Sequence, residues 1–144
     1  MSIAWHEIRD HLMFSSSTLG FQHTFDELRR SSEPLAHFAD PAAVLDTLHV
    51  GCSAPDDKNR LLVALVAAAQ SGGAASDCAL TLMLLALWPG LDAVRRRSIW
   101  RRIGTGDEVA SEILARASET IRGLDLRRVN WIAATILRNI ERDL

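Results

Sequence analysis

The sequence has few of the residues that build disulfide frameworks and β-hairpins. Its 144 residues include two cysteines, Cys52 and Cys78, which cannot form a disulfide framework. No Asn-Gly or Asp-Gly pair occurs, and no segment alternates strictly between apolar and polar residues, so neither hairpins nor half-buried strands are indicated. The opening residues also lack the basic, apolar and small-residue order of a secretory leader. We therefore expect a cytoplasmic protein.

Residues with metal-ligating or catalytic chemistry are few and scattered. Of five histidines, only His49 lies near a cysteine, Cys52, and no second ligand pair accompanies them, so we expect no metal site. Gly104 and Gly106 resemble a fragment of a phosphate loop, but no strand precedes them and no GK[ST] follows. No serine or cysteine has the flanking residues of a nucleophile elbow. We expect neither enzymatic activity nor a cofactor.

A membrane span is not predicted. The longest apolar segment, residues 78–91, has 14 residues and contains the pair Pro89-Gly90. A transmembrane helix needs about 20 residues. This segment therefore predicts a buried core helix.

Lysine is nearly absent, because the 16 basic residues are Lys58 and 15 arginines. Residues 1–90 contain 5 basic and 10 acidic side chains, whereas residues 91–144 contain 11 arginines and 8 acids. The planar donor fork of arginine suits phosphates and carboxylates, so the C-terminal part favours a polyanionic or acidic partner. Arginines on solvated helix faces would give the same composition.

The apolar spacing predicts an all-α domain of six to seven helices. A capping-box pattern at residues 24–27 predicts a helix start, with a break near residues 33–34. Asp40-Pro41 predicts a helix over 40–50, and the next helix is expected over 58–70. The stripe expected to be buried on that helix consists of Leu61, Leu62, Leu65, Val66 and Ala69.

Ser76 is expected to cap the most apolar helix, which Pro89-Gly90 terminates or kinks. A second capping box at 105–108 predicts a helix to about Arg122, and Asn130 is expected to cap a last helix over 131–142. The inward residues predicted for this half are Leu91, Val94, Ile99, Ile103, Val109, Ala110, Ile113, Leu114, Ala117, Ile121, Ile132, Thr135 or Ile136, Leu137 and Ile140.

The last two predicted helices carry opposite charge on their polar sides. One presents acidic and small polar residues, a surface suited to a basic protein partner. The following loop and helix carry arginines that can pair with phosphates, and Trp131 could stack on an unpaired base. In a second interpretation, Trp131 is a core anchor and the arginines are only solvated.

These helices resemble region 2 of bacterial sigma-70-family factors. Residues 107–117 (DEVASEILARA) resemble the acidic helix of that region. Residues 131–143 (WIAATILRNIERD) are similar to the tryptophan-led helix of the compact, extracytoplasmic-type sigma factors. With residues 80–102 as the opening helices, the resemblance implies a sigma region 2-like domain over 77–144. Residues 1–76 would then form an N-terminal helical part suited to partner binding.

The resemblance implies a bacterial transcription regulator that acts at the nucleoid, in the cytoplasm. It implies that one helix binds the clamp helices of core RNA polymerase and that the loop and last helix contact the −10 element of promoter DNA. The implied polymerase-binding residues are Asp107, Glu108, Ser111 and Glu112, and the implied DNA-binding residues are Arg127, Arg128, Asn130, Trp131, Arg138 and Arg142.

Several departures from the family pattern refine this expectation. The sequence ends soon after the last helix, so we expect no second DNA-binding domain. It contains no tyrosine, which reduces the family's aromatic row to Trp131, and Ser111 replaces a glutamine. We therefore expect an adaptor that works with a companion DNA-binding activator protein, similar to the polymerase-contacting component of gene-transfer-agent activators. The alternative is a helical protein–protein interaction module, for oligomerisation or as an anti-sigma-type adaptor, without nucleic-acid binding.

Overall fold

The computed structural model describes residues 2–50, 54–101 and 106–144, and every secondary-structure element in those ranges is a helix. The expected all-α class is confirmed, with eight helices in the described residues rather than six to seven. They are α1 (Ser2–Ser16), α2 (Leu19–Ser31), α3 (Glu33–Ala36), α4 (Pro41–His49), α5 (Pro55–Ala69), α6 (Ala74–Trp100), α7 (Gly106–Gly123) and α8 (Ile132–Asp143).

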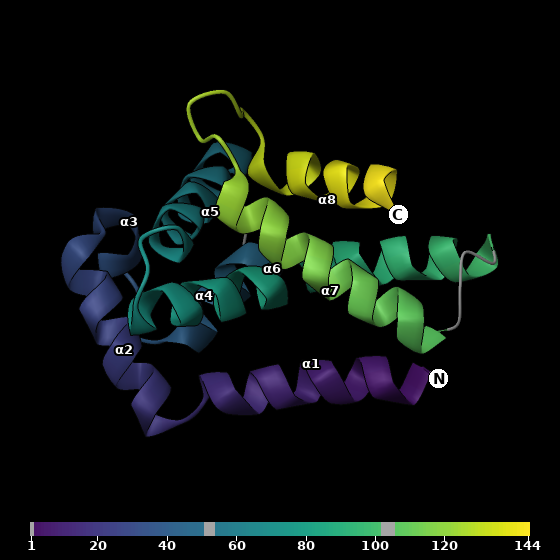
Figure 1. Cartoon of the computed structure of the whole chain (residues 1–144). Helices are drawn as coiled ribbons and strands as arrows, with labels where there is room; N and C mark the ends of the chain where they lie inside the picture. Colours follow the sequence, from purple (N-terminus) through teal and green to yellow (C-terminus); the bar gives the residue numbers. More distant parts are fainter. Residues whose placement is uncertain (1, 51–53, 102–105) are drawn as a thin grey trace.

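α6 is the central helix of the bundle. It contacts α1, α2, α4, α5, α7 and α8, and Figure 1 shows α1 and α8 on opposite sides of it. Its buried leucines join a core that extends from Trp5 of α1 to Ile140 of α8. The predicted boundary between residues 76 and 77 lies inside α6, so both predicted segments share this contiguous core. Their division of labour stays a prediction.

The apolar character of α6 agrees with its central position. By length and composition alone α6 could cross a membrane, and 56% of its most apolar window is buried against the other helices. A helix that is apolar on most sides is buried either in lipid or in protein. Residues 78–91, which were predicted to form a buried core helix, lie within α6 and supply much of the core.

α2 begins earlier than its sequence pattern predicts. Its N-cap is Thr18, whose Oγ1 accepts a hydrogen bond from the amide of Phe21 at 3.2 Å. The helix start predicted at residues 24–27 is wrong, because Thr24 lies inside α2 and its hydroxyl donates to the carbonyl of Gly20. A threonine hydroxyl can bond either a free amide or a carbonyl one turn earlier, so the local pattern does not fix the choice.

The predicted helices over 40–50 and 58–70 are confirmed as α4 and α5. The Oδ1 atom of Asp40 accepts from the amide of Ala43 at 2.8 Å and caps α4. α5 begins at Pro55, slightly before the predicted start, because a proline in the first helical turn lacks only an amide that would have no partner. The predicted stripe is buried: Leu61, Leu62, Leu65, Val66 and Ala69.

Ser76 does not cap α6, contrary to the prediction. The N-cap is Gly73, whose φ of 85° lies in the left-handed region that glycine adopts without a Cβ clash. Ser76 is buried in the first turn of α6, where its hydroxyl donates to the carbonyl of Ala69 at the end of α5. The serine therefore joins two helices.

Pro89 does not terminate α6, which continues to Trp100. A proline inside a helix lacks the amide that would donate to the carbonyl four residues earlier, here that of Leu85. The Nε2 atom of His49, the last residue of α4, lies 3.0 Å from the oxygen of Leu85 and 3.2 Å from that of Ala86. A donor from outside α6 thus occupies the carbonyl that Pro89 leaves without a partner in the helix.

The second half of α6 differs from the prediction in two ways. Gly90 does not help to end the helix; it lets α8 approach, since a Cβ there would overlap the side chain of Leu137. Leu91 and Val94 are buried as predicted, but Ile99 is 36% exposed, and Arg95 and Ser98 occupy the inward row instead. Ile103 lies outside the described residues. The inward row after Pro89 therefore contains polar side chains that apolar periodicity does not mark.

α7 and α8 bury the faces that were predicted to point inward. Leu114 and Leu137 are half-buried, and the following residues are buried: Val109, Ala110, Ile113, Ala117, Ile121, Ile132, Ile136 and Ile140. Residue 105 of the second capping box lies outside the described residues. The opposite sides of α7 and α8 are exposed to solvent, and they hold the candidate site.

Candidate nucleic-acid interface

Residues 124–131, which connect α7 to α8, are fixed at both ends by side chains from α5 and its C-cap. Gln70 is the C-cap of α5. Its side-chain Nε2 atom donates to the backbone carbonyls of Ile121 at 3.0 Å and Leu124 at 2.8 Å. At the other end, Asn59 Nδ2 donates to the carbonyl of Asn130 at 2.7 Å. These bonds satisfy backbone groups at a helix end and in the loop, so the loop is held against α5.

Asn130 is not the N-cap of α8, contrary to the prediction. The N-cap is Trp131, whose side chain makes no capping hydrogen bond. The first free amide of the helix, that of Ile132, donates instead to the Oδ1 atom of Asn59 at 2.8 Å. The cap is thus supplied from α5, and it fixes the backbone on both sides of Trp131.

Arg127 and Arg128 extend from this loop into solvent, with 91% and 87% of their side-chain surface exposed. The backbone turn that presents them is closed by Asp125, whose Oδ1 atom accepts from the amide of Arg127 at 3.1 Å. The same carboxylate lies 3.4 Å from the Nε atom of Arg127 and 3.6 Å from that of Arg128. One carboxylate therefore faces two guanidiniums, which leaves the turn positively charged.

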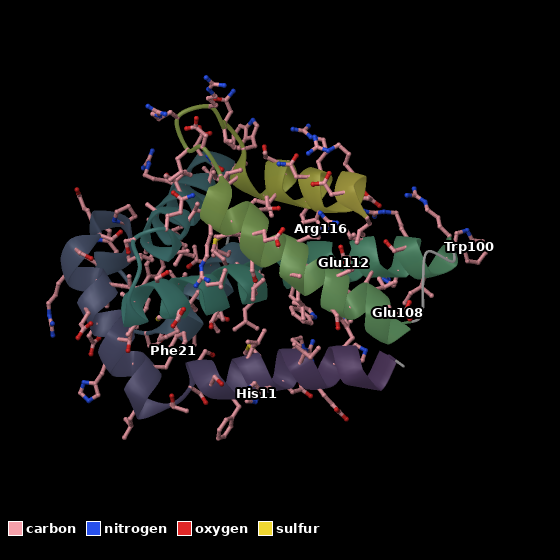
Figure 2. The ribbon with its side chains drawn as sticks, in the orientation of Figure 1. His11, Phe21, Trp100, Glu108, Glu112 and Arg116 are labelled. Atoms are coloured by element: carbon pink, nitrogen blue, oxygen red, sulfur yellow. The ribbon has the colours of Figure 1, made fainter. Side chains whose placement is uncertain are left out.

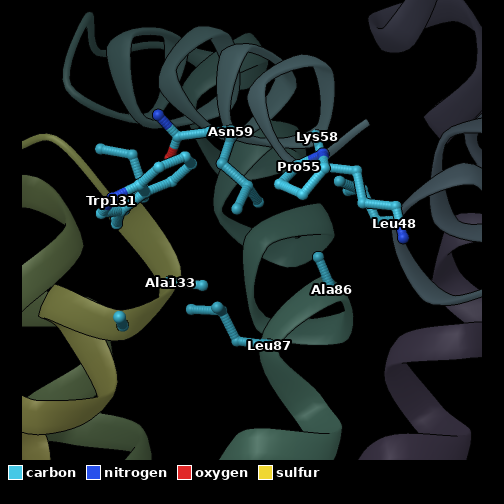
Figure 3. A pocket seen from close by; sticks show the side chains of 11 residues that line it. Leu48, Pro55, Lys58, Asn59, Ala86, Leu87, Trp131 and Ala133 are labelled. Atoms are coloured by element: carbon cyan, nitrogen blue, oxygen red, sulfur yellow. The ribbon is translucent and has the colours of Figure 1, made fainter. Parts of the chain in front are cut away.

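Trp131 is half-exposed, with 50% of its surface accessible, at the edge of an apolar pocket of ≈ 370 Å³. Figure 3 shows the indole beside Asn59, with α5, α6 and α8 around the pocket. The lining residues are Leu48, Pro55, Lys58, Asn59, Leu62, Ala86, Leu87, Trp131, Ile132, Ala133 and Ala134. One part of the indole packs against protein while the rest is accessible for stacking. The core-anchor interpretation of Trp131 is therefore wrong.

Trp131 begins a row of exposed residues along α8. Helical spacing places Trp131, Ala134, Arg138 and Arg142 on the same side, opposite the buried isoleucines, and all four are exposed. We call this set the exposed row of α8. At 1.5 Å per residue the row is about 16 Å long. Arg142 lies 3.2 Å from Asp143, which partly neutralises the far end of the row.

The acidic side of α7 is exposed as predicted. Glu108, Ser111 and Glu112 are exposed, and Figure 2 shows Glu108 and Glu112 along α7 with Arg116 one turn further on. The side chain of Asp107 lies outside the described part of the structure. Arg116 Nε donates to Glu112 Oε1 at 2.7 Å, and this hydrogen bond raises the pKa of the Arg116 guanidinium. The negative charge at Glu112 is therefore partly neutralised within the helix.

Glu119 extends the acidic side of α7, although it was not among the predicted residues. It is exposed, and it lies two turns after Glu112, on the same side as Ala115. We call Glu108, Ser111, Glu112, Ala115 and Glu119 the outward row of α7. Glu119 lies seven residues after Glu112, and this spacing, which places both on one side of a helix, could have identified it from the sequence. Asn59 and Gln70 were also missed, because their hydrogen bonds join residues far apart in the sequence.

The structure brings no metal-ligating cluster together in the residues that it describes. Within residues 2–50, 54–101 and 106–144, no three His, Cys, Asp or Glu side chains form a candidate ligand set. The spaced pair His49 and Cys52 includes Cys52, which is outside these ranges, and His49 binds backbone carbonyls. Burial raises the pKa of the Cys78 thiol to about 12, so this side chain is a neutral thiol at neutral pH.

No protein-family model matches the chain, and no curated protein or solved structure matches it either.

Proposed function

We propose that this protein is a non-enzymatic bacterial transcription regulator. It binds core RNA polymerase through the outward row of α7, and it contacts promoter DNA through residues 124–131 and the exposed row of α8. The observation that carries the proposal is a loop, anchored at its ends by Gln70 and Asn59, that exposes Arg127 and Arg128 a few residues before half-exposed Trp131. Guanidiniums next to an accessible indole combine phosphate pairing with base stacking, as single-strand binding requires.

The charge distribution of α7 supports a protein partner for that helix. Glu108, Glu112 and Glu119 lie on its solvent side, whereas its opposite side is buried in the core. An acidic row on a rigid helix suits docking to a basic protein surface, and it repels the DNA backbone. The resemblance of residues 107–117 to the polymerase-binding helix of sigma region 2 points to core RNA polymerase as that partner.

The small size of the positive surface supports the need for a companion protein. A row of about 16 Å reaches only a few phosphates of one strand, and affinity for DNA grows with the number of phosphates neutralised. A separate DNA-binding activator would supply the remaining affinity and the choice of promoter.

Polymerase binding is tested by charge reversal on α7. We expect the double variant Glu112→Arg/Glu119→Arg to lose association with purified core RNA polymerase in a pull-down, with little change in stability, because both positions are exposed. The matched control is Glu27→Arg, a charge reversal at an exposed glutamate of α2. Wild-type association of the double variant would remove the assignment of α7.

DNA binding is tested with forked DNA whose strands are unpaired at the −10 region, and with the salt dependence of the affinity. We expect Arg127→Ala/Arg128→Ala to weaken binding and to lower the salt slope by about 0.7 for each phosphate that the variant no longer neutralises. The control is Arg30→Ala/Arg60→Ala, two exposed arginines on other helices. A protein that binds neither forked DNA nor polymerase would favour the alternative, a helical interaction module.

A further inference from the structure

The last turn of α6 carries an exposed tryptophan that the proposed polymerase and DNA contacts do not use. Trp100 is 87% exposed, the highest value among the large hydrophobic side chains of the described residues. Figure 2 shows it at the edge of the molecule, directed away from the helices. Tryptophan side chains are largely buried on average. An indole as exposed as that of Trp100 buries little apolar surface and so contributes little to the stability of the fold. It is available to a ligand.

Three exposed arginines lie within four residues of Trp100 on the same helix end. Arg96 lies 3.3 Å from Asp92, Arg97 forms a bidentate pair with Glu141, and Arg101 is 4.0 Å from that same carboxylate. Two carboxylates therefore face three guanidiniums, and the group stays positively charged. We call Arg96, Arg97, Trp100 and Arg101 the basic end of α6. A basic last turn is favourable for the helix dipole, but that effect gives no reason for an exposed indole.

The basic end of α6 is joined by an ion pair to the C-terminal end of α8, where the exposed row ends. The pair between Arg97 and Glu141 joins the C-terminal ends of the two helices, with distances of 2.6 and 3.0 Å. Glu141 precedes Arg142, the last member of the exposed row, while Trp100 lies about one turn beyond Arg97. This ion pair joins the helix that begins after Trp131 to the helix end that carries Trp100, and both indoles are accessible.

We propose that the basic end of α6 is a second contact site for a single-stranded nucleic acid, with Trp100 as a stacking platform and Arg96 and Arg101 as phosphate partners. The proposal rests on the proposed function, because the strand reaches this site along the exposed row of α8. An exposed indole stacks on any base, and arginine adds cation–π and phosphate contacts. A strand that also contacts the basic end of α6 would bind a longer surface, and pair more of its phosphates, than α8 alone allows.

A nucleic acid fits this site better than a membrane surface does. A membrane-binding helix lies in the interface with a whole apolar face immersed. The apolar face of α6 is instead buried in the core through Leu91 and Val94, which leaves Trp100 and part of Ile99 exposed at its end. Two side chains at a helix terminus offer little apolar area to lipid, whereas one indole suffices to stack a base.

The experiment uses the four tryptophans as site-specific reporters. Trp5 and Trp88 are buried, so Trp131→Phe leaves Trp100 as the exposed fluorophore, and Trp100→Phe leaves Trp131. Oligothymidylates of about 4 to about 16 nucleotides, the range of site sizes in single-strand binding domains, are titrated into each protein. We expect long strands to quench both reporters. The shortest strands should quench Trp131 and leave Trp100 unchanged.

Affinity measurements give a second readout. Trp100→Ala should weaken binding of the long strands about tenfold, from the stacking contribution of one base, and leave the shortest strands unaffected. Arg96→Gln/Arg101→Gln should weaken the long strands and reduce their salt slope, whereas Arg30→Gln/Arg60→Gln should not. Because these side chains are exposed, unchanged thermal melts are expected for all these variants.

The outcomes separate this proposal from the proposed function. If Trp100→Ala binds every strand as the wild type does while Trp131→Ala is weakened, the second site is wrong and the proposed DNA contact stands. If oligothymidylate quenches neither reporter and binds no variant, both are wrong. Vesicles of phosphatidylglycerol and phosphatidylcholine form a separate arm. A blue shift of Trp100 emission with vesicles, but no response to strands, would replace the nucleic acid with a membrane surface.

Discussion

The indole rings of Trp5 and Trp88 stack on each other, with centroids 4.2 Å apart and planes inclined by 25°. The Nε1 atom of Trp5 donates to Asp92 Oδ1 at 3.1 Å, and the guanidinium of Arg95 lies 5.5 Å from the centre of the Trp5 ring. One fully buried residue of α1 therefore makes stacking, hydrogen-bonding and cation–π contacts with α6. These contacts attach the N-terminal helix to the central one.

We expect Trp5→Ala to lower the free energy of unfolding by about 3–5 kcal/mol, the cost of emptying a large buried site. Trp5→Phe should cost less, because it retains the stacking but loses the bond to Asp92. Urea denaturation followed by circular dichroism measures both changes. Trp100→Ala, on the exposed end of α6, is the control, expected within about 0.5 kcal/mol of the wild type. Similar costs for Trp5→Ala and Trp100→Ala would contradict the anchoring role.

His49 and Pro89 should be energetically coupled. Since a carbonyl only accepts, the Nε2 atom of His49 carries the proton that it donates to Leu85. We expect His49→Ala to cost about 1–2 kcal/mol in the wild type, because it leaves this carbonyl unpaired. In a Pro89→Ala background the amide of residue 89 can bond Leu85, so the same change should cost clearly less. A double-mutant cycle by urea denaturation measures the coupling, and strictly additive effects would disprove it.

Asn59 should control both the stability of α8 and the position of Trp131. Asn59→Ala removes the bonds to Asn130 and Ile132, and we expect a loss of about 1–2 kcal/mol, as for a helix cap. Asn59→Asp keeps the acceptor for Ile132 and places a negative charge at the N-terminus of α8, so its loss should be smaller. Urea denaturation measures stability, and acrylamide quenching of Trp131 in a Trp100→Phe background measures indole exposure. Equal losses for both variants would argue against capping.

The pair between Arg97 and Glu141 predicts a pH dependence. The hydrogen bond from Arg97 lowers the pKa of the Glu141 carboxyl below its usual 4.5. A group whose pKa is lowered on folding stabilises the protein above its unfolded pKa, and this contribution disappears as the pH falls through the folded pKa. We therefore expect the wild type to be more stable than Glu141→Gln at neutral pH. The difference should shrink below about pH 4.5.

Thermal melts of both proteins between pH 7 and pH 3 measure this difference. The matched control is Glu119→Gln, at an exposed glutamate of α7 that is not part of the pair between Arg97 and Glu141. A gap between wild type and Glu141→Gln that persists unchanged at low pH would show that the carboxylate charge is not the cause.

Local patterns predicted much of the fold. The apolar spacing of α5, α7 and α8 identified their buried faces, because a helix closes its hydrogen bonds within four residues and repeats its faces every 3.6. The polar caps were less predictable. Thr24, Ser76 and Asn130 carry side chains that typically cap helices, yet each capping prediction was wrong, because the same groups have alternative partners in the folded chain. Arg127 and Arg128 are exposed, and their role in DNA binding stays a prediction, whereas Asn59 could not be found from local sequence.

The amino-acid sequence by itself determined an all-helical chain, the buried faces of its regular helices, and an arginine-rich C-terminal part. Only the tertiary structure decided that Pro89 lies inside a continuous helix and that α5 caps α8. It also decided that Trp5 and Trp88 are buried, whereas Trp100 and Trp131 are exposed. The physical reason is that helix periodicity arises from bonds between neighbouring residues, whereas the burial of an indole and the partner of a polar atom depend on distant helices that pack around them.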